Sequence, residues 1–249
     1  MAAEDLIICV PSKGRPNTKI VDVMATAGLK PVIFVEPQDA KAYAGLPIYV
    51  MEKNNQGLPY ARNAILEYAR ESGQRYLFMC DDDIQHFCVV RNQRAAKTDA
   101  SVVTEGYEQM KKGGFTLAGL AFRQYGWADK QPVRVNSKLP VACVYLDLQQ
   151  TTAIYRQYTL KGDYDFALQV LQGGGRVGLF NRLCFHTPDI GTNPGGLHEV
   201  YSQSEAHRSS VRELCAAWPR YTTAIKRKGR YDVKIDVKQL ARDTNQHYV

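Results

Sequence analysis

The sequence predicts an α/β fold in which a mostly parallel central sheet is flanked by helices. Two observations predict this class. Short apolar runs of strand length alternate with stretches of helical spacing through the first half of the chain, which is typical of strands joined by helical crossovers. The chain also has 249 residues, of which 45% are hydrophobic and 23% charged, so it can bury a large core. This composition excludes disorder, collagen and a small disulfide-stapled protein.

The first half is predicted to alternate strands and helices from its beginning. Apolar residues recur at helical spacing over 59–71, and 76–80 is a continuous apolar run of strand length. In order, the predicted elements are a strand at 6–10, a helix at 18–26, a strand at 31–35, a short helix at 38–44, a strand at 47–51, the helix at 59–71 and the strand at 76–80. Ligands of such sheets bind outside the carboxyl ends of the strands.

The second half is less regular. Its predicted helices are 102–112, 148–155, 164–172 and 202–217, the last ended by Pro219, and its predicted strands are 116–122, 141–146 and 176–185. The run 188–196 is rich in Gly, Pro, Asn and Thr, which predicts a loop. Without a long linker or an internal repeat, we expect one domain over residues 1–217 and a basic C-terminal extension over 218–249.

The positive charge is concentrated in that extension. The chain carries a net charge of +7, but 218–249 holds eight basic and three acidic residues, which leaves only +2 for the rest. A nearly neutral body with a basic tail favours a polyanionic partner. A solvated surface helix that aids solubility is the equal alternative.

The remaining composition indicates a protein of the cytoplasm. The longest apolar runs are about five residues, whereas a membrane span needs about twenty. No secretory signal is visible at the N-terminus. The six cysteines are scattered without a CxxC pair, so we expect reduced core residues.

Three adjacent carboxylates, Asp81, Asp82 and Asp83, follow the predicted strand 76–80 directly. Like charges this close repel one another, and a hard divalent ion such as Mg²⁺ or Mn²⁺ relieves that repulsion. In an extended segment Asp81 and Asp83 share one face and Asp82 lies on the other. An acidic turn that caps the next element is the alternative, but the position after a core strand favours a functional role.

Two loops offer weaker signals of a ligand site. The loop at 54–63 contains Gly57 and Arg62 and leads into a helix, so it can present backbone N–H groups and one guanidinium to an anion. The loop at 11–16 follows the first strand, and it is either a tight connection or a nucleotide-facing loop.

Taken in order, these motifs resemble the nucleotide-sugar-binding half of GT-A glycosyltransferases. The matching residues are Pro11-Ser12 with Arg15-Pro16, Val35-Glu36, Asn55 and Gly57-Leu58 with Ala61-Arg62-Asn63, and the three aspartates. The resemblance implies a GT-A-like fold with a Rossmann-like nucleotide-binding half at 1–90 and an acceptor half at 91–217. It places Pro11, Ser12, Arg15, Glu36, Gly57, Arg62, Asp81 and Asp82 at the nucleotide sugar. Glu36 stands where the family usually has Asp.

The same resemblance implies roles for residues of the second half. Asp163 corresponds to the general base that accepts the proton of the acceptor hydroxyl, and Asp165 to a residue that orients the acceptor or the base. A helix cap and a first-turn carboxylate are compatible readings of the same two residues. Asp83 and His186 would hold the divalent metal, Mn²⁺ or Mg²⁺, and His198 competes with His186. The loop at 188–196 would close over the donor.

The implied reaction moves a sugar from a nucleotide sugar, with a UDP-sugar the first choice, to a hydroxyl, with inversion at the anomeric carbon. The chain further resembles the phage-type TET/JBP-associated glycosyltransferases, which modify 5-hydroxymethylpyrimidines in DNA. On that resemblance the acceptor is DNA, with 5-hydroxymethylcytosine first, and Lys226, Arg227, Lys228 and Arg230 contact phosphates. Tyr125 and Trp127 either stack on a sugar or base or pack on the surface.

Two other functions remain open from the sequence. A GT-A glycosyltransferase could act on a glycan, a protein or a small molecule, with a tail that only aids solubility or lies at a membrane surface. A non-catalytic nucleic-acid-binding module is disfavoured because Asp81, Asp83 and Asp163 are all present. A sugar nucleotidylyltransferase is disfavoured because its glycine-rich N-terminal signature is absent, since 11–16 holds one glycine.

Overall fold

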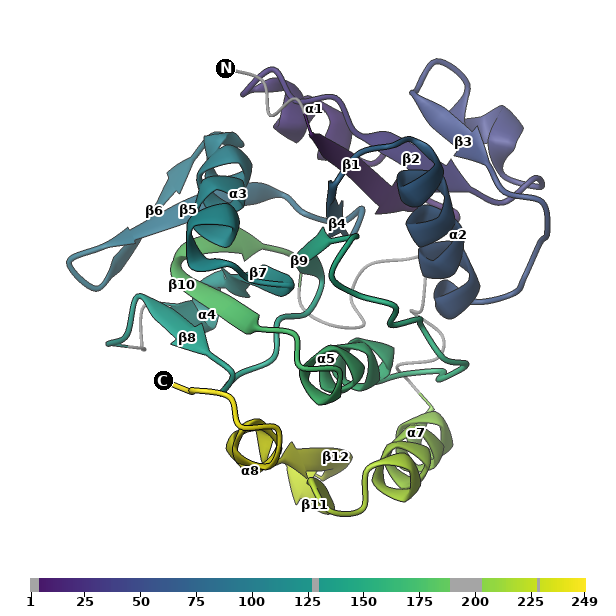
Figure 1. Ribbon diagram of the computed structural model, residues 1–249. Coiled ribbons are helices and arrows are strands. Elements are labelled where there is room, and N and C mark those ends of the chain that lie inside the picture. The colour runs from purple at the N-terminus through teal and green to yellow at the C-terminus, as the bar shows by residue number, and fades with distance from the viewer. Residues whose placement is uncertain (1–4, 127–129, 189–202, 228) are drawn as a thin grey trace.

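A computed structural model describes residues 5–126, 130–188, 203–227 and 229–249. At its centre is a ten-stranded sheet with the order β3-β2-β1-β4-β9-β7-β10-β5-β6, in which β8 pairs with β10. Helices cover both faces of this sheet, and a separate hairpin, β11-β12, lies near the C-terminus (Figure 1).

The elements have the following bounds in the described part of the chain. The sheet consists of β1 (Leu6–Pro11), β2 (Val32–Val35), β3 (Ile48–Val50), β4 (Tyr76–Cys80), β5 (His86–Arg91), β6 (Arg94–Thr98), β7 (Leu117–Phe122), β8 (Val133–Val135), β9 (Cys143–Asp147) and β10 (Val177–His186), and the hairpin of β11 (Thr222–Arg227) and β12 (Arg230–Ile235). The helices are α1 (Ile20–Ala25), α2 (Leu58–Glu71), α3 (Ser101–Gly113), α4 (Arg123–Gly126), α5 (Gly162–Gln172), α7 (Ser204–Ala217) and α8 (Val237–Asp243), with a 3-10 turn η1 (Ala40–Tyr43). None of these helices is long and apolar enough to cross a bilayer.

The strand directions confirm the predicted fold class. Strands β3, β2, β1 and β4 pair in parallel, and β7 pairs in parallel with β10. Strand β9 runs antiparallel to both β4 and β7, while β5 and β8 run antiparallel to β10 and β6 runs antiparallel to β5. Seven of the ten described strands of the central sheet therefore share one direction. The chain is an α/β protein with a mostly parallel sheet flanked by helices.

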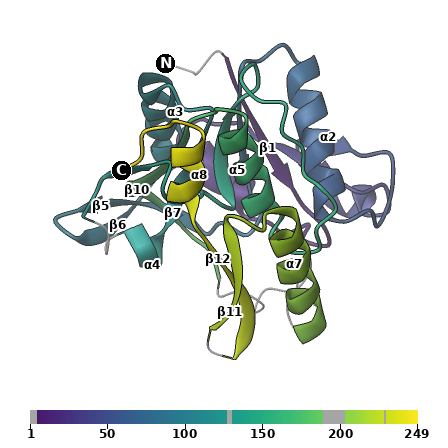
Figure 2. The ribbon, with the colours of Figure 1, turned by 60° about the horizontal axis from the view of Figure 1, so that its bottom comes forward.

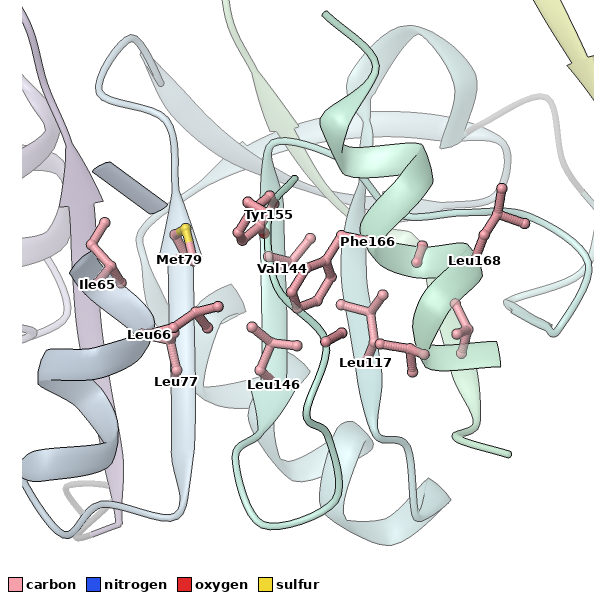
Figure 3. Packing of buried hydrophobic residues seen from close by; sticks show 14 of the residues in the cluster. Ile65, Leu66, Leu77, Met79, Leu117, Val144, Leu146, Tyr155, Phe166 and Leu168 are labelled. Carbon is pink, nitrogen blue, oxygen red and sulfur yellow. The ribbon is translucent and has the colours of Figure 1, made fainter. Parts of the chain in front are cut away.

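Each face of the sheet buries its own hydrophobic core. On β4, Leu77 and Met79 pack in the core beneath α2 and α5, while Phe78 and Cys80 face the opposite core beneath α1 and α3. This division follows from the alternation of side chains along a strand. Figure 3 shows the first core, where Phe166 of α5 lies over the same strands. Burial of each large apolar side chain stabilises the fold by about 1.5–3 kcal/mol.

The prediction of a helix at 148–155 is wrong. The segment is irregular because side-chain amides from two neighbouring helices take its backbone hydrogen bonds. Asn63 donates to the carbonyl of Tyr155 at 2.8 Å and accepts from its N–H at 2.9 Å, and Gln169 makes the same pair of contacts with Ile154. These bonds offer the backbone an alternative to a helix, which the apolar spacing alone does not reveal.

A hairpin that the sequence analysis did not predict follows the three aspartates. Strands β5 and β6 pair in register, and the turn between them has positive φ at Asn92 (49°) and Gln93 (59°). Positive φ at both central residues is the signature of a tight two-residue hairpin turn. The aspartates therefore occupy a turn between two strands of the central sheet.

The basic segment 218–249 packs against the rest of the protein. It forms β11, β12 and α8, and it contributes Trp218, Val233, Val237 and Leu240 to the core that contains α2 and α5. The chain end also returns to the sheet, because Val249 and Val135 exchange two backbone hydrogen bonds of 2.9 and 3.0 Å. The six cysteines are unpaired, as predicted, and all but Cys215 are buried.

We predict that Gly119→Ala destabilises the fold by about 1–3 kcal/mol, because overpacking in a sheet core costs this much. A Cβ at Gly119 on β7 would contact Pro140 and lie 2.6 Å from the carbonyl oxygen of Cys143. Urea unfolding measures the change. Gly173→Ala is the control, since its Cβ would meet no atom closer than 3.4 Å. Equal midpoints for the two variants would contradict the close packing of β7 on β9.

Candidate active site

Three parallel strands end at the same edge of the sheet. The residues at or just after their ends include predicted residues of the nucleotide-sugar site. Strand β1 ends at Pro11 and leads to Ser12, β2 leads to Glu36, and β4 leads to Asp81. Because β1 pairs in parallel with both neighbours, these three positions are adjacent. The structure therefore brings the predicted nucleotide-sugar residues of the first half together.

Asp82 faces inward and joins the loop after β1 to the turn after β4. Its carboxylate accepts hydrogen bonds from the hydroxyl of Ser12 and from Arg15, and its backbone carbonyl accepts from Thr18. The Ser12 hydroxyl also lies 2.7 Å from the Tyr43 hydroxyl. Burial raises the pKa of Asp82, while Arg15 and Ser12 act in the opposite direction. The contacts of Asp82 therefore hold the loop after β1 against the turn after β4.

Arg62 connects Asp81 to Asp163, which belongs to the other half of the chain. The buried guanidinium extends from α2 and lies 3.3 Å from an oxygen of Asp81, and its second amino group donates to Asp163 at the start of α5. The guanidinium carbon Cζ of Arg62 lies 5.2 Å from the ring centroid of Tyr155. The Nε of Arg62 is buried without a hydrogen-bond partner among the described residues. An unpaired buried donor at this point is suited to a ligand oxygen.

The charges at this junction are strongly coupled. Burial opposes the charge of Arg62, but Asp163, Tyr155 and Asp81 raise its pKa above the usual value. Burial, reinforced by Asp83 and Asp163 and opposed by Arg62, raises the pKa of Asp81 to about 7. An additional cation at this place would relieve the like-charge repulsion that contributes to the raised pKa.

A polar network that the sequence analysis missed surrounds Glu36. This buried carboxylate receives hydrogen bonds from Lys13 and from the side chain of Gln38 at 2.7 Å. Lys13 also donates to Asn55 at 2.7 Å, which ties the loop before α2 to the end of β2. Gly57 follows in that loop with a φ of 82°, a conformation that favours glycine, and it precedes α2 directly. Asn55 begins the motif that continues with Gly57, whereas Lys13 and Gln38 were not singled out from the sequence.

The two carboxylates at the start of α5 have different environments. Asp163 is 27% exposed and faces Arg62. Asp165 is fully buried, and it accepts hydrogen bonds from Trp218 at 2.8 Å and Gln169 at 2.7 Å and pairs with Arg156 at 3.2 Å. Positions two apart on a helix point in different directions. The structure therefore brings Asp163 to Arg62 and buries Asp165 against Trp218 of the C-terminal segment.

The structure describes two of the three residues predicted to hold the metal, Asp83 and His186. Asp83 is 21% exposed and lies 3.7 Å from Arg15. His186 ends β10 in register with His86, and the two rings are 4.8 Å apart. Burial lowers the pKa of His86, and the neighbouring His186 lowers it further. His198 lies outside the described residues.

The oxygen donors fit a hard divalent ion held partly by substrate. Among the described residues, no three His, Cys, Asp or Glu side chains form a group that could hold a metal without other ligands. A magnesium-like ion does not need such a group, because it usually takes one or two carboxylates together with substrate phosphates. Asp81 and Asp83 supply carboxylates of this kind at the edge of the sheet, so the residues present fit the expected metal.

The cationic end of the C-terminal hairpin is linked to the start of α5, because Arg227 lies 4.0 Å from Asp232, which pairs with Lys161. Lys226, Arg227 and Arg230 are exposed at the end of β11-β12, whereas Lys228 and Trp127 lie outside the described residues. Burial raises the pKa of Tyr164 to about 12, with Asp232 and Asp163 raising it further and Arg227 lowering it. Tyr125, which is 66% exposed, also raises the pKa of Tyr164.

We predict that Trp218→Phe destabilises the protein by about 1–3 kcal/mol, because the buried Asp165 then loses one hydrogen-bond donor. In a chain that already carries Asp165→Ala, the same change should cost much less, since the acceptor is gone. Unfolding of the two single variants and the double variant measures this difference. Strictly additive losses would contradict the structural role of Asp165.

Comparisons with known proteins address the identity of this arrangement. A search of curated proteins finds no match. Solved structures with 10–11% identity are similar to the chain: the A197 protein from STIV (TM-score 0.44, 72% of this chain and 83% of that chain), a CMP:2-keto-3-deoxy-manno-octonic acid synthetase complexed with CTP (0.47, 86% and 99%), and mannose-1-phosphate geranyltransferase from Thermus thermophilus (0.43, 73% and 75%).

The family comparison is more informative. The model of the TET-associated glycosyltransferases matches residues 6–196, a stretch that runs from β1 past β10 and includes Arg62, the three aspartates and Asp163. It therefore confirms the family suggested by the sequence motifs. The chain belongs to the TET-associated glycosyltransferase family.

Proposed function

We propose that this glycosyltransferase moves a sugar from a nucleotide sugar, with a UDP-sugar the first choice, to the hydroxyl of a 5-hydroxymethylpyrimidine in DNA. 5-Hydroxymethylcytosine is the first choice of acceptor base. The observation that carries the proposal is the position of Arg62, which joins Asp81 of the acidic cluster to Asp163 at the edge where three strands end. Family membership supports the transfer of a glycosyl group.

The donor occupies the edge formed by β1, β2 and β4. Glu36, Lys13 and Asn55 provide the hydrogen-bonding groups for the nucleoside, and Pro11 and the loops at Ser12 and Gly57 form the surrounding wall. Arg62 presents its guanidinium to the diphosphate, since arginine matches phosphate oxygens in geometry and charge. Its unpartnered Nε provides a donor for that contact.

Asp83, with Asp81 beside it, would hold a divalent ion, Mn²⁺ or Mg²⁺, and His186 is the predicted additional ligand. When bound, such an ion neutralises charge on the departing nucleotide diphosphate. Two guanidiniums, those of Arg15 and Arg62, face four carboxylates here, and this excess of negative charge supports a further cation.

Asp163 acts on the acceptor. Its carboxylate accepts the proton of the acceptor hydroxyl as the hydroxyl oxygen forms a bond to the anomeric carbon. The bond between that carbon and the diphosphate oxygen breaks, and the electron pair leaves with the nucleotide diphosphate. A single displacement of this kind inverts the anomeric carbon.

The acceptor contacts are assigned to the basic end of β11-β12. The hydroxymethyl group of the pyrimidine lies in the major groove, and extrusion of the base brings it into an enzyme site. Lys226, Arg227 and Arg230 are exposed at this end, and Arg227 lies 4.0 Å from Asp232, which pairs with Lys161 just before α5. Lysines and arginines in this position contact DNA phosphates.

The proposal is tested by mass spectrometry of nucleosides. The protein is incubated with DNA that contains 5-hydroxymethylcytosine, a panel of UDP-sugars and Mn²⁺. We expect a mass gain of one sugar on the modified base, which is lost in Asp83→Ala and reduced at least about hundredfold in Asp163→Asn. Sugar transfer or UDP release without modified DNA would assign another acceptor, and no turnover of any donor would favour a binding module.

The phosphate contacts are tested by the salt dependence of DNA binding. We predict that Lys226→Ala, Arg227→Ala and Arg230→Ala each weaken binding and reduce the salt slope by about one unit. Lys112→Ala is the control, because Lys112 is exposed at the end of α3, beneath which the opposite core lies. Unchanged slopes in the hairpin variants would reject this surface as the DNA contact.

A further inference from the structure

The residue that precedes α5 has an unfavourable backbone conformation. Lys161 has φ 68° and ψ 8°, in the left-handed region that residues with a Cβ rarely adopt. It lies two positions before Asp163, so its conformation sets the direction in which the first turn of α5 begins. Strained residues of this kind persist only where surrounding contacts hold them.

An ion pair with the C-terminal hairpin provides such a contact. Lys161 Nζ donates to Asp232 Oδ1 at 2.7 Å, and the two side chains are only 18% and 27% exposed. The same Asp232 oxygen accepts from the backbone N–H of Val233 at 2.9 Å, which fixes the carboxylate. Lys161 Nζ also lies 5.4 Å from the ring centroid of Tyr164.

The hairpin that contains Asp232 packs against the core of the protein. Val233 is buried in the same core as Phe166 of α5. On the other side, the N–H of Leu160 donates to the Ser210 hydroxyl of α7 at 3.1 Å. Residues 160 and 161 are therefore held between α7 and β12, which lie beside each other below α5 in Figure 1.

We propose that the β11-β12 hairpin positions Asp163 through the Lys161–Asp232 ion pair. Lys161 and Asp232 are positioning residues, and this inference rests on the proposed role of Asp163 as the base. The cations proposed to bind DNA lie on the same hairpin, so one element both receives the acceptor and positions the carboxylate that activates it. The matched family region ends at residue 196, before this hairpin begins.

Figure 2 shows the hairpin beside α7 and extending away from α5, with β11 and β12 forming one continuous arm. The exposed Lys226, Arg227 and Arg230 lie at one end of this arm, and Asp232 lies two residues into β12. Loss of the ion pair would leave the seated hairpin in place but would release residue 161 from its left-handed conformation. A shift of about 1 Å at a reacting group can lower a rate about hundredfold.

The inference is tested by kinetics of Lys161→Met, Asp232→Asn and the double variant. We expect kcat to fall about tenfold or more in each, with the donor KM unchanged and the double variant no worse than either single one. Lys161→Arg should recover most of the rate, because it restores the cation. Arg220→Met is the matched control, since it breaks the 3.0 Å pair between Arg220 and Asp243 in the same C-terminal segment.

A kcat within twofold of wild type, or an equal loss in Arg220→Met, would overturn the inference. If the wild-type protein transfers no sugar to hydroxymethylated DNA, the proposed function fails. Hydrogen exchange then tests whether the ion pair positions the start of α5. Faster exchange of the amides at 163–165 in Asp232→Asn, without a change in Arg220→Met, supports the positioning of the helix start. Unchanged exchange rejects it.

Discussion

The buried guanidinium of Arg62 is the contact on which the geometry of the candidate site depends. It extends from α2 to Asp81, which follows β4, and to Asp163, which begins α5. A buried cation is stable only when carboxylates compensate it, and removal of one partner of a buried pair typically costs about 3–5 kcal/mol. The same cation limits the repulsion between two carboxylates that come from different halves of the chain. Each group therefore keeps the others in place.

In each of the two acidic motifs, some aspartates face the site and others are buried and support the structure. Asp81 and Asp83 remain at the edge of the sheet, while Asp82 between them turns inward to Ser12 and Arg15. On α5, Asp163 faces the site while Asp165 is buried against Trp218. The chemistry proposed for the edge therefore depends on buried carboxylates of the same type that only support it. The C-terminal segment joins this support through Trp218 and through the hairpin.

Local patterns predicted what depends on local residues. The strands and helices up to β4, the acidic cluster and the opposite orientation of Asp82 all follow from the spacing of neighbouring residues. The prediction failed where distant side chains decide the structure, as at 148–155, whose backbone is bound by Asn63 and Gln169. The polar network of Lys13 with Asn55 and the pairing of Lys161 with Asp232 join residues far apart in the sequence. No periodicity in the sequence records such contacts.

If Arg62 holds Asp163 on the acceptor side of the donor edge, a single carboxylate serves as the base and the sugar is transferred in one displacement. The most direct test is proton NMR of the anomeric centre in freshly formed product. Inverted configuration relative to the donor is the predicted result. Retained configuration would contradict the assignment of Asp163 as the base, because it requires a different course of displacement at the same carbon.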